Sequence, residues 1–303
     1  MAVAYAKVLR NMARDIVVVG RGNPSCEKFE SETGIQPVPG GLKGFLGQTK
    51  EVFETAILAV TVTSLAEAAK SAMHHGIKRI LLEKPGGLNL LEIEGVAQAA
   101  REAEAQVFIA YNRRFFASAQ AAKRLIADDG EVTSVLCNFT EAVFRIGARL
   151  HPPHVMKNWF FMNSTHVVDL GLHLAGVPSD LQALRRGGLD WHPRGAVFAG
   201  HGSLSEQGVF GYFADWLAPG RWGVEVATRR HRLILQPLET LRIQKAGSFV
   251  VEDVTLNNEA DIAFKPGLFR MLESFFGDSD QLCTLEQHLR HCREVYEIIC
   301  PAN

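Results

Sequence analysis

Short apolar runs alternate with amphipathic stretches along the first third of the chain. Four of these runs are apolar without alternation, at residues 15–20, 55–60, 79–85 and 106–112. Such runs are typical of strands that are buried on both faces. Stretches with helical periodicity lie between them, at residues 26–33, 64–76 and 90–104. This order predicts an α/β domain with a doubly wound parallel sheet, in which ligands bind at the carboxyl ends of the strands.

The rest of the chain has a different pattern. Its apolar runs follow one another with few helices between them, at residues 134–144, 208–216, 222–228, 231–237 and 239–244. Such close spacing favours antiparallel hairpins, and so predicts a C-terminal α+β domain with a large, mostly antiparallel open sheet. Helices are expected near residues 164–175, 264–276 and 284–299. We place the domain boundary after Asn112, which gives domains of residues 1–112 and 113–303.

The first residues do not fit the start of a dinucleotide-binding Rossmann sheet. Such a fold opens with a strand and a glycine-rich turn, whereas this chain opens inside a helical pattern at residues 2–13. The missing strand would be central in the usual order, so its absence predicts a gap in the sheet. Two explanations stay open at this point: a cropped or mis-set start, and a protein that does not hold a cofactor in the usual way.

Composition and charge restrict the classes of partner. The 303 residues are 47% apolar and 21% charged, with a formal net charge of −1, so nothing favours overall attraction to nucleic acid or to anionic membranes. The basic clusters Arg113-Arg114, Arg185-Arg186 and 229–232 are short and are interpreted as solvated surface. The five cysteines are scattered and form no C-x-x-C pair, as expected in a reducing compartment. With no long apolar run and no signal-peptide pattern, we expect a cytoplasmic protein.

Glu83, Lys84 and Pro85 follow the third apolar run. A lysine at the carboxyl end of a buried strand lies where a cofactor and a substrate would meet. The proline restricts the backbone of Lys84 to an extended conformation, and the Lys-Pro bond is open to the cis form. The alternative interpretation is an ordinary surface turn.

Residues 164–176 form a largely apolar helix with a narrow polar stripe. Ser164 is a candidate N-cap, and His166, Asp169 and His173 fall within about 60° of one another around the helix axis. Burying such a stripe is unfavourable unless its groups are paired, so the hypothesis is functional, with a satisfied core cluster as the alternative. Two histidines and a carboxylate are also zinc-compatible, but the H-E-x-x-H signature is absent and we expect no metal.

Gly20-Arg21-Gly22 follows the first apolar run. NAD-binding folds usually carry an acidic residue at this point, whereas NADP-binding folds place an arginine nearby. Because a guanidinium binds phosphate well, Arg21 favours NADP over NAD. The alternative is a solvated loop arginine.

Five segments together resemble the glucose–fructose oxidoreductase / inositol dehydrogenase family, Gfo/Idh/MocA. They are LLEKPGG, IAYNRRFFASAQAAKRLI, NSTHVVDLGLHLAG, RWGVEVATRRHRLILQPLETL and CREVYEII. The pairing of E-K-P with a downstream D-x-x-x-H is more specific than either motif alone. The family's N-terminal G-x-G-x-x-G is absent, with Ala2 in place of its last glycine, and Gly86-Gly87 replaces a frequent apolar residue after E-K-P.

The resemblance implies hydride transfer between NADP(H) or NAD(H) and a hydroxyl or carbonyl of a sugar, inositol or nucleotide sugar. It implies that Lys84 hydrogen-bonds the reacting oxygen, that His173 transfers the proton, and that Asp169 lies beside the substrate. It also implies that Thr61, Thr63 and Ser64 lie along the dinucleotide and that Asn112 lies near the nicotinamide. Together with Arg21, Glu83 and Lys84, these are the expected cofactor-binding residues. The open sheet is a dimer surface in the family, so we expect a homo-oligomer.

The choice of substrate is less determined by the sequence. Residues 144–160 are rich in cations, and we name Arg149, His154 and Lys157, together with His166, as candidates for binding an anionic sugar. A surface loop with scattered cations is the alternative. Trp159 and Trp222 either stack on a sugar or belong to the core. Two other functional classes stay open: a non-catalytic homologue that has lost the cofactor site, and a metal-dependent hydrolase using His166, Asp169 and His173.

Overall fold

The computed structural model describes residues 1–146 and 151–302, which form two compact units. The first unit consists of residues Met1–Ala110 and Ala260–Leu289, and the second of residues Tyr111–Glu259 and Arg290–Asn303. The single boundary expected after Asn112 does not describe these units, because the chain returns to the first unit at Ala260. The physical reason for the return is a strand pairing described next.

Among the described residues, the first unit contains a sheet of four strands in the order β1-β2-β3-β12. Its strands are β1 (Thr55–Leu58), β2 (Arg79–Leu82), β3 (Gln106–Ile109) and β12 (Cys283–Thr284). The first three strands are parallel and in register, and their carboxyl ends therefore share one edge. The late strand β12 pairs antiparallel with β3 and brings the end of the chain back to this sheet.

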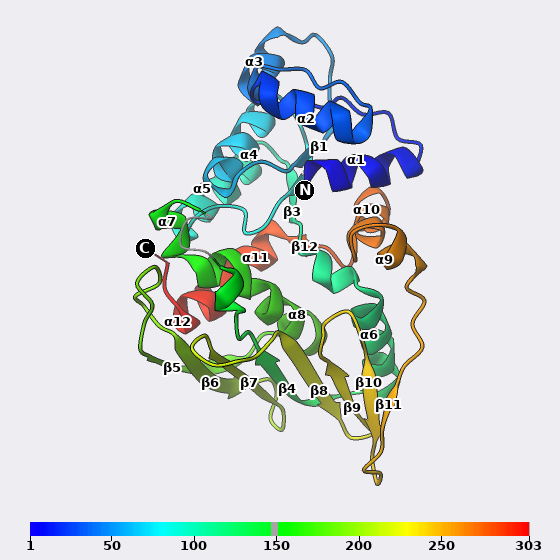
Figure 1. Cartoon of the computed structure of the whole chain (residues 1–303), viewed down its shortest axis with the longest axis vertical. Coiled ribbons are helices and arrows are strands. Elements are labelled where there is room, and N and C mark those ends of the chain that lie inside the picture. The colour runs from blue at the N-terminus through cyan, green and yellow to red at the C-terminus, as the bar shows by residue number, and fades with distance from the viewer. Residues whose placement is uncertain (147–150, 303) are drawn as a thin grey trace. The chain divides into compact units, whose positions relative to one another are not determined.

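Helices surround this sheet (Figure 1). The crossover helices α4 (Leu65–His74) and α5 (Leu90–Glu102) confirm the predicted alternation of strands and helices. The remaining helices of the unit are α1 (Ala2–Asn11), α2 (Asn23–Thr33), α3 (Gly41–Gln48), α9 (Glu259–Ala263), α10 (Leu268–Phe276) and most of α11 (Leu285–His291). The sequence pattern did not indicate α3, because glycines interrupt it.

The strand predicted at residues 15–20 is not part of the sheet, and this prediction was wrong. The segment makes one isolated parallel bridge, between Val19 and Val38, and the side chain of Val17 is 48% exposed. A strand is stable when its backbone groups are paired on both sides or solvated. The sheet ends at β1 on this side, so the segment has no strand to pair with. The gap expected from the sequence is therefore present.

In the described part of the second unit, eight strands form one sheet in the order β11-β10-β9-β8-β4-β7-β6-β5. The strands are β4 (Val132–Asn138), β5 (Ser179–Arg186), β6 (Val197–Ser203), β7 (Val209–Asp215), β8 (Gly223–Thr228), β9 (His231–Leu235), β10 (Arg242–Lys245) and β11 (Val251–Asp253). Adjacent strands are antiparallel except β4 and β7. The fold is thus the predicted α/β sheet combined with a large, mostly antiparallel sheet.

The sequence pattern missed β5 and β6, because both depart from the usual composition of strands. Strand β5 carries polar and charged residues along its exposed face, and β6 contains two glycines. A side chain at Gly200 would lie 2.2 Å from the Gln182 carbonyl oxygen and 2.4 Å from the Tyr212 ring. The glycine therefore permits close packing that a typical strand residue would prevent.

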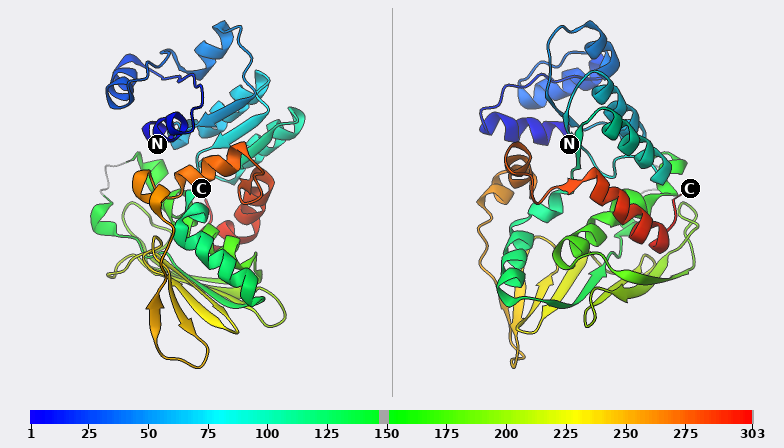
Figure 2. Two further views of the ribbon diagram at one scale, coloured as in Figure 1. Left: turned by 90° about the vertical axis from the view of Figure 1, so that its right-hand side faces the viewer. Right: turned by 180° about the vertical axis from the view of Figure 1, so that it is seen from behind.

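Helices α6 (Ala117–Asp129) and α8 (Thr165–Ala175) cover one face of this sheet (Figure 2). Helix α8 packs closely on β4, because a Cβ at Gly171 would lie 2.3 Å from the Cys137 sulfur. The other face exposes apolar side chains of β4, β5 and β7, namely Leu136, Leu184, Val209 and Phe213. Within residues 1–146 and 151–302, no helix is both long and apolar enough to cross a membrane.

Candidate functional site

In the first unit, the structure brings together four of the predicted cofactor-binding residues. The Arg21 guanidinium donates a hydrogen bond to Ser64 Oγ at 2.8 Å. The Thr61 hydroxyl lies 3.2 Å from Ser64 Oγ and 3.3 Å from Thr63 Oγ1. We call these four residues the Arg21 cluster. It is exposed and lies just beyond residues 15–20 and strand β1, where one guanidinium and three hydroxyls face solvent.

Glu83 follows strand β2, but its carboxylate is occupied. The hydroxyl of Tyr5, on α1, donates to Glu83 Oε1 at 2.7 Å. Burial raises the pKa of Glu83 above its usual value, and the hydrogen bond from Tyr5 offsets part of this effect. Burial also raises the pKa of Tyr5. Glu83 therefore fixes α1 to the end of β2, and no pattern in residues 1–11 indicated this role for Tyr5.

Lys84 comes next, at the carboxyl end of β2, and it is partly buried. The Lys84–Pro85 peptide bond is cis. The His288 ring donates from Nε2 to the Pro85 carbonyl at 2.8 Å, so the turn is held by a buried side chain from the last third of the chain. The backbone at Lys84 is thus fixed at the same edge of the sheet as the Arg21 cluster.

In the second unit, α8 begins differently from the prediction. A π-turn over Phe160–Ser164 precedes the helix, and the Ser164 side chain makes no capping hydrogen bond. Its hydroxyl donates instead to the buried carboxylate of Glu141 at 2.7 Å, and Asn163 donates to the same group. Ser164 is therefore the N-cap residue by position, as predicted, but its side chain does not cap the helix, because its hydroxyl binds Glu141.

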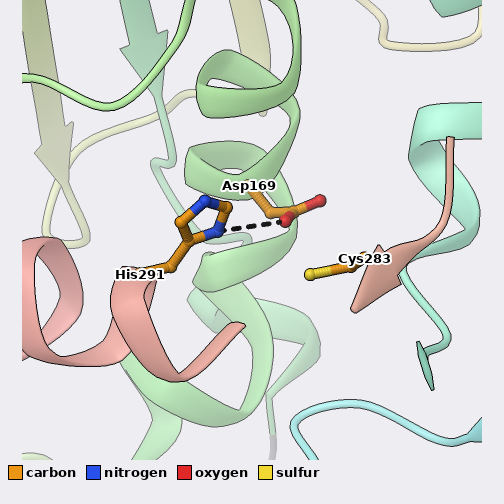
Figure 3. A group of neighbouring side chains, drawn as sticks. All are labelled: Asp169, Cys283 and His291. Carbon is orange, nitrogen blue, oxygen red and sulfur yellow. Dashed lines mark ion pairs between the residues drawn. The ribbon is translucent and has the colours of Figure 1, made fainter. Parts of the chain in front are cut away.

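Asp169 forms a buried, two-bonded ion pair with Arg114. Arg114 Nε donates to Oδ2 at 2.8 Å and Nη2 donates to Oδ1 at 2.6 Å, with both side chains 1% exposed. Burial alone would raise the pKa of Asp169, but the Arg114 guanidinium holds it well below the usual range. His291 Nδ1 lies 3.7 Å from Oδ1 (Figure 3). The interpretation of Arg113-Arg114 as solvated surface was therefore wrong for Arg114.

His173 lies one turn further along α8, beside another cation. Its Nε2 lies 3.3 Å from Lys123 Nζ on α6. Burial, together with the positive charges of Arg114 and Lys123, lowers the pKa of His173 to about 3. The imidazole is therefore neutral at pH 7. With Lys123 protonated, its ammonium donates to Nε2, so the ring carries its own hydrogen on Nδ1.

The polar stripe of α8 does not form a common set of metal ligands. Asp169 binds a guanidinium and His173 faces an ammonium, and a metal cation would be repelled by both neighbours. The third member, His166, lies among aromatic rings, 5.6 Å from the centre of Tyr111 and 6.2 Å from that of Trp222. This geometry gives no support to the metal-dependent hydrolase.

Asn112 and Trp222 join His166 in a cluster of the second unit. Asn112 is buried, and Arg113 donates to its Oδ1 at 3.2 Å. The Arg113 guanidinium also lies 4.9 Å from the centre of the Trp222 ring, which is partly exposed. We call Tyr111, Asn112, Arg113, His166 and Trp222 the Trp222 cluster. The sequence pointed to Asn112 and His166, but it gave no reason to connect Arg113 with Trp222.

The other predicted substrate residues are not brought into this cluster. His154, in α7 (Pro153–Met156), and Lys157 are exposed, and the structure records no hydrogen bond between their side chains and the Trp222 cluster in the part of the chain that it describes. Arg149 lies outside the described residues. Trp159 is buried, and the centre of its ring lies 6.2 Å from the centre of the Trp191 ring. It therefore belongs to the core.

Comparisons with known proteins place the chain by its fold. No family model matches, and no curated protein sequence matches either. Levoglucosan dehydrogenase in complex with NADH has a TM-score of 0.79 at 14% identity, over 98% of this chain and 92% of that chain. An inositol dehydrogenase homologue from Azotobacter vinelandii, complexed with NADH and myo-inositol, has a TM-score of 0.77 at 14% identity, over 98% and 90% of the two chains.

A third similar structure is the UDP-N-acetylglucosamine 3-dehydrogenase from Acidithiobacillus ferrooxidans. Its TM-score is 0.73 at 16% identity, over 99% of this chain and 94% of that chain. The coverage shows that the likeness extends over both units. The chain therefore has the two-unit fold of these dehydrogenases.

The ion pair leads to a stability prediction. Asp169→Asn leaves the Arg114 charge without its partner, so we expect the free energy of unfolding at pH 7 to fall by about 3–5 kcal/mol in urea titrations. Because the pKa of Asp169 is lowered in the folded state, its contribution is fully present above the unfolded value of about 3.9 and is lost as the pH falls below it. The difference between wild type and variant should therefore narrow below about pH 4.

The exposed residue Asp253, on β11, provides the matched control. Asp253→Asn should change stability by less than about 0.5 kcal/mol at any pH. Equal effects of the two substitutions at pH 7 would contradict the assignment of the ion pair.

Proposed function

We propose that the chain is an oxidoreductase of the Gfo/Idh/MocA type. It would transfer a hydride between NADP(H) or NAD(H) and a hydroxyl or carbonyl of a sugar, an inositol or a nucleotide sugar. The fold supports this proposal, since similar structures include sugar, inositol and nucleotide-sugar dehydrogenases. The observation that carries it is the Arg21 cluster, which lies at the same edge of the sheet as Lys84.

The Arg21 cluster fits a dinucleotide. A guanidinium and three hydroxyls match the phosphate and ribose groups of such a ligand in charge and in hydrogen bonding. We propose that Arg21, Thr61, Thr63 and Ser64 bind the cofactor, with NADP preferred over NAD, and that Asn112 contributes at the nicotinamide. The bound nicotinamide would supply the hydride acceptor or donor. Glu83 acts indirectly in this proposal, because its carboxylate binds Tyr5.

Lys84 and His173 would act on the reacting oxygen. As a cation, Lys84 would stabilise negative charge that develops on an alkoxide. His173 is neutral, so it can accept a proton during oxidation of an alcohol. Because Nδ1 carries the ring hydrogen, we propose that Nε2 accepts the proton of the substrate once the Lys123 ammonium has moved away from this nitrogen. Asp169 becomes a positioning residue in this scheme, because both of its oxygens bind Arg114.

The Trp222 cluster is the proposed substrate-binding surface of the second unit. Trp222 presents an aromatic face on which a sugar ring could stack, and Asn112, Arg113 and His166 add hydrogen-bonding groups. The predicted contributions of Arg149, His154 and Lys157 remain part of the proposal for anionic substrates. The cluster supports a polyhydroxylated small molecule as substrate.

The second candidate is a non-catalytic binding protein of the same fold, since a fold does not by itself imply catalysis. A protein of this class would bind a sugar in the second unit without oxidising it. Steady-state assays with NADPH and NADH distinguish the two candidates, since only the enzyme changes the absorbance of the cofactor.

The first prediction of this proposal concerns turnover. Lys84→Ala and His173→Ala should each lower kcat/KM for the best polyol substrate by at least about a hundredfold, because each removes charge or proton-transfer stabilisation of the transition state. Absorbance of NADPH at steady state measures this loss. The exposed residues Lys50 and His74 provide matched controls, and their alanine variants should keep the wild-type rate. Near-normal turnover in both test variants would reject the assignment.

A second prediction concerns the choice of cofactor. Arg21→Ala should weaken NADPH binding by about tenfold or more, since one charge-assisted hydrogen bond to phosphate contributes about 1.5–3 kcal/mol. NADH binding should change much less. Fluorescence titration of each reduced cofactor measures both constants. Equal losses for the two cofactors would show that Arg21 does not contact the additional phosphate.

A third prediction concerns assembly. We propose that the free apolar face of the eight-stranded sheet mediates a homo-oligomer, because contiguous exposed apolar side chains on a sheet mark association surfaces. Phe213→Glu should shift the protein toward a monomer in light scattering coupled to size exclusion. Leu217→Glu, at another exposed apolar residue outside the strands, should not. A monomeric wild type at micromolar concentration would contradict this proposal.

A further inference from the structure

Lys123 and His173 lie side by side in the second unit, on two helices that pack against each other. Lys123 belongs to α6 and His173 to α8. The Lys123 ammonium lies 3.3 Å from His173 Nε2, and both side chains are partly exposed to solvent. A small molecule can therefore reach this pair from outside.

In the part of the chain that the structure describes, the Lys123 ammonium has no acidic partner, and its hydrogen bond is with His173. The carboxylate on the neighbouring helix, Asp169, is occupied by Arg114 through both of its oxygens. Burial, followed by the positive charge of Arg114, lowers the pKa of Lys123. An anion beside the ammonium would stabilise its charged form.

The charges around His173 leave an excess of positive charge. The charged or titratable groups that act on this imidazole are Arg114, Lys123, Asp169 and His291. Arg114 and Asp169 form an ion pair, which leaves the Lys123 ammonium as the unbalanced cation. A cation that is partly removed from water attracts an anionic ligand more strongly than a fully solvated one.

The same ammonium blocks the nitrogen that the proposed reaction needs. Nε2 carries the lone pair of the neutral ring, and the ammonium donates to this lone pair. Proton transfer therefore requires that the ammonium move and bind another acceptor. The flexible four-carbon stem of lysine allows such a movement. An acceptor on the substrate itself makes the movement favourable when the substrate is bound.

Geometry limits where that acceptor lies on the substrate. The reacting hydroxyl must come within about 2.8 Å of Nε2, and the ammonium starts 3.3 Å from the same nitrogen. A carboxylate on the adjacent carbon fits, since its nearer oxygen lies about 2.7 Å from the hydroxyl oxygen, the length of a hydrogen bond. A phosphate ester holds its charged oxygens further away, and a neighbouring hydroxyl would leave the cation unbalanced.

We propose that the Lys123 ammonium binds a carboxylate of the substrate, next to the reacting hydroxyl, and so frees Nε2 of His173. This inference rests on the proposed function, in which His173 accepts the proton. The substrate class is then a polyhydroxylated 2-hydroxy acid, such as a sugar acid. Its oxidation breaks the O–H and C–H bonds at the carbon beside the carboxylate. The proton goes to Nε2, the hydride goes to the oxidised nicotinamide, and a 2-oxo acid is the product.

The test measures binding of glycolate, the smallest 2-hydroxy acid, to the protein without cofactor and at constant ionic strength. Ethylene glycol is the matched neutral ligand, because it has a hydroxymethyl group in place of the carboxylate. The imidazole nitrogens are followed by NMR in protein with isotope-labelled histidine, and the His173→Gln variant identifies the His173 resonances. We expect saturable binding of glycolate with a shift of the Nε2 resonance, and at least tenfold weaker binding of ethylene glycol.

Lys123→Met should weaken glycolate binding at least tenfold, because it removes the charge that binds the carboxylate and keeps much of the side-chain volume. Arg124→Met is the matched control, since Arg124 is the next residue of α6, is exposed and carries the same charge. Its affinity for glycolate should stay within about twofold of the wild-type value, because solvent and salt screen an exposed charge. Thermal unfolding shows whether both variants are folded.

The inference is overturned if glycolate binds no better than ethylene glycol, if the Nε2 resonance of His173 does not shift, or if the two methionine variants lose affinity equally. It is also overturned if inorganic phosphate binds as tightly as glycolate with the same shift, because the site would then select by charge alone. Should Lys123→Met fail to fold, the comparison of the three ligands on the wild type decides. Since the titrations contain no cofactor, absence of hydride transfer would reject the proposed function and leave the binding result intact.

Discussion

The buried ion pair between Arg114 and Asp169 is the interaction on which the second unit depends. It joins the segment that follows Tyr111 to the middle of α8. The two side chains are buried and share two hydrogen bonds. Replacing such a pair by apolar residues is often neutral, whereas removing one partner is strongly destabilising. The pair therefore fixes the position of α8 against the segment that contains Arg114. Because His166 and His173 lie on α8, their positions depend on it as well.

Electrostatics in this region have one consistent effect. Arg114 and Lys123 place two cations near a largely apolar helix, and one of them is neutralised by Asp169. Burial and this positive potential together keep His173 neutral at pH values well below the usual pKa of an imidazole. The lowered pKa also makes this imidazole a weak base, and its unprotonated nitrogen, Nε2, faces the Lys123 ammonium.

The sequence predicted the fold well where local pattern and tertiary structure agree. The alternation of buried strands and helices in residues 55–112 and the hairpins of the second half are present. The failures have physical causes that lie outside local pattern. Residues 15–20 have the composition of a strand but lack a neighbour, and β6 contains glycines because Tyr212 packs against it. The sequence could not indicate these relations between distant segments.

For the candidate site too, the sequence indicated the motif residues but not the residues that they contact. Motif spacing led to Arg21, Ser64 and Lys84 in one unit and to Asp169 and His173 in the other. Their partners were missed, because Tyr5, Arg114 and Lys123 are ordinary residues of amphipathic segments until the fold brings them beside a carboxylate or an imidazole. Arg114 was even interpreted as surface, since a pair of arginines in sequence carries no sign that one is buried.

The pairing of β12 with β3 also has a consequence for synthesis on the ribosome. Cys283 and Thr284 belong to the sheet of the first unit, although they are translated after the whole stretch from Tyr111 to Glu259. Domains usually fold in the order in which they emerge. Here the first unit cannot be completed until the stretch from Tyr111 to Glu259 has been made, and the second unit in turn needs residues that follow β12, so each unit waits for a late segment.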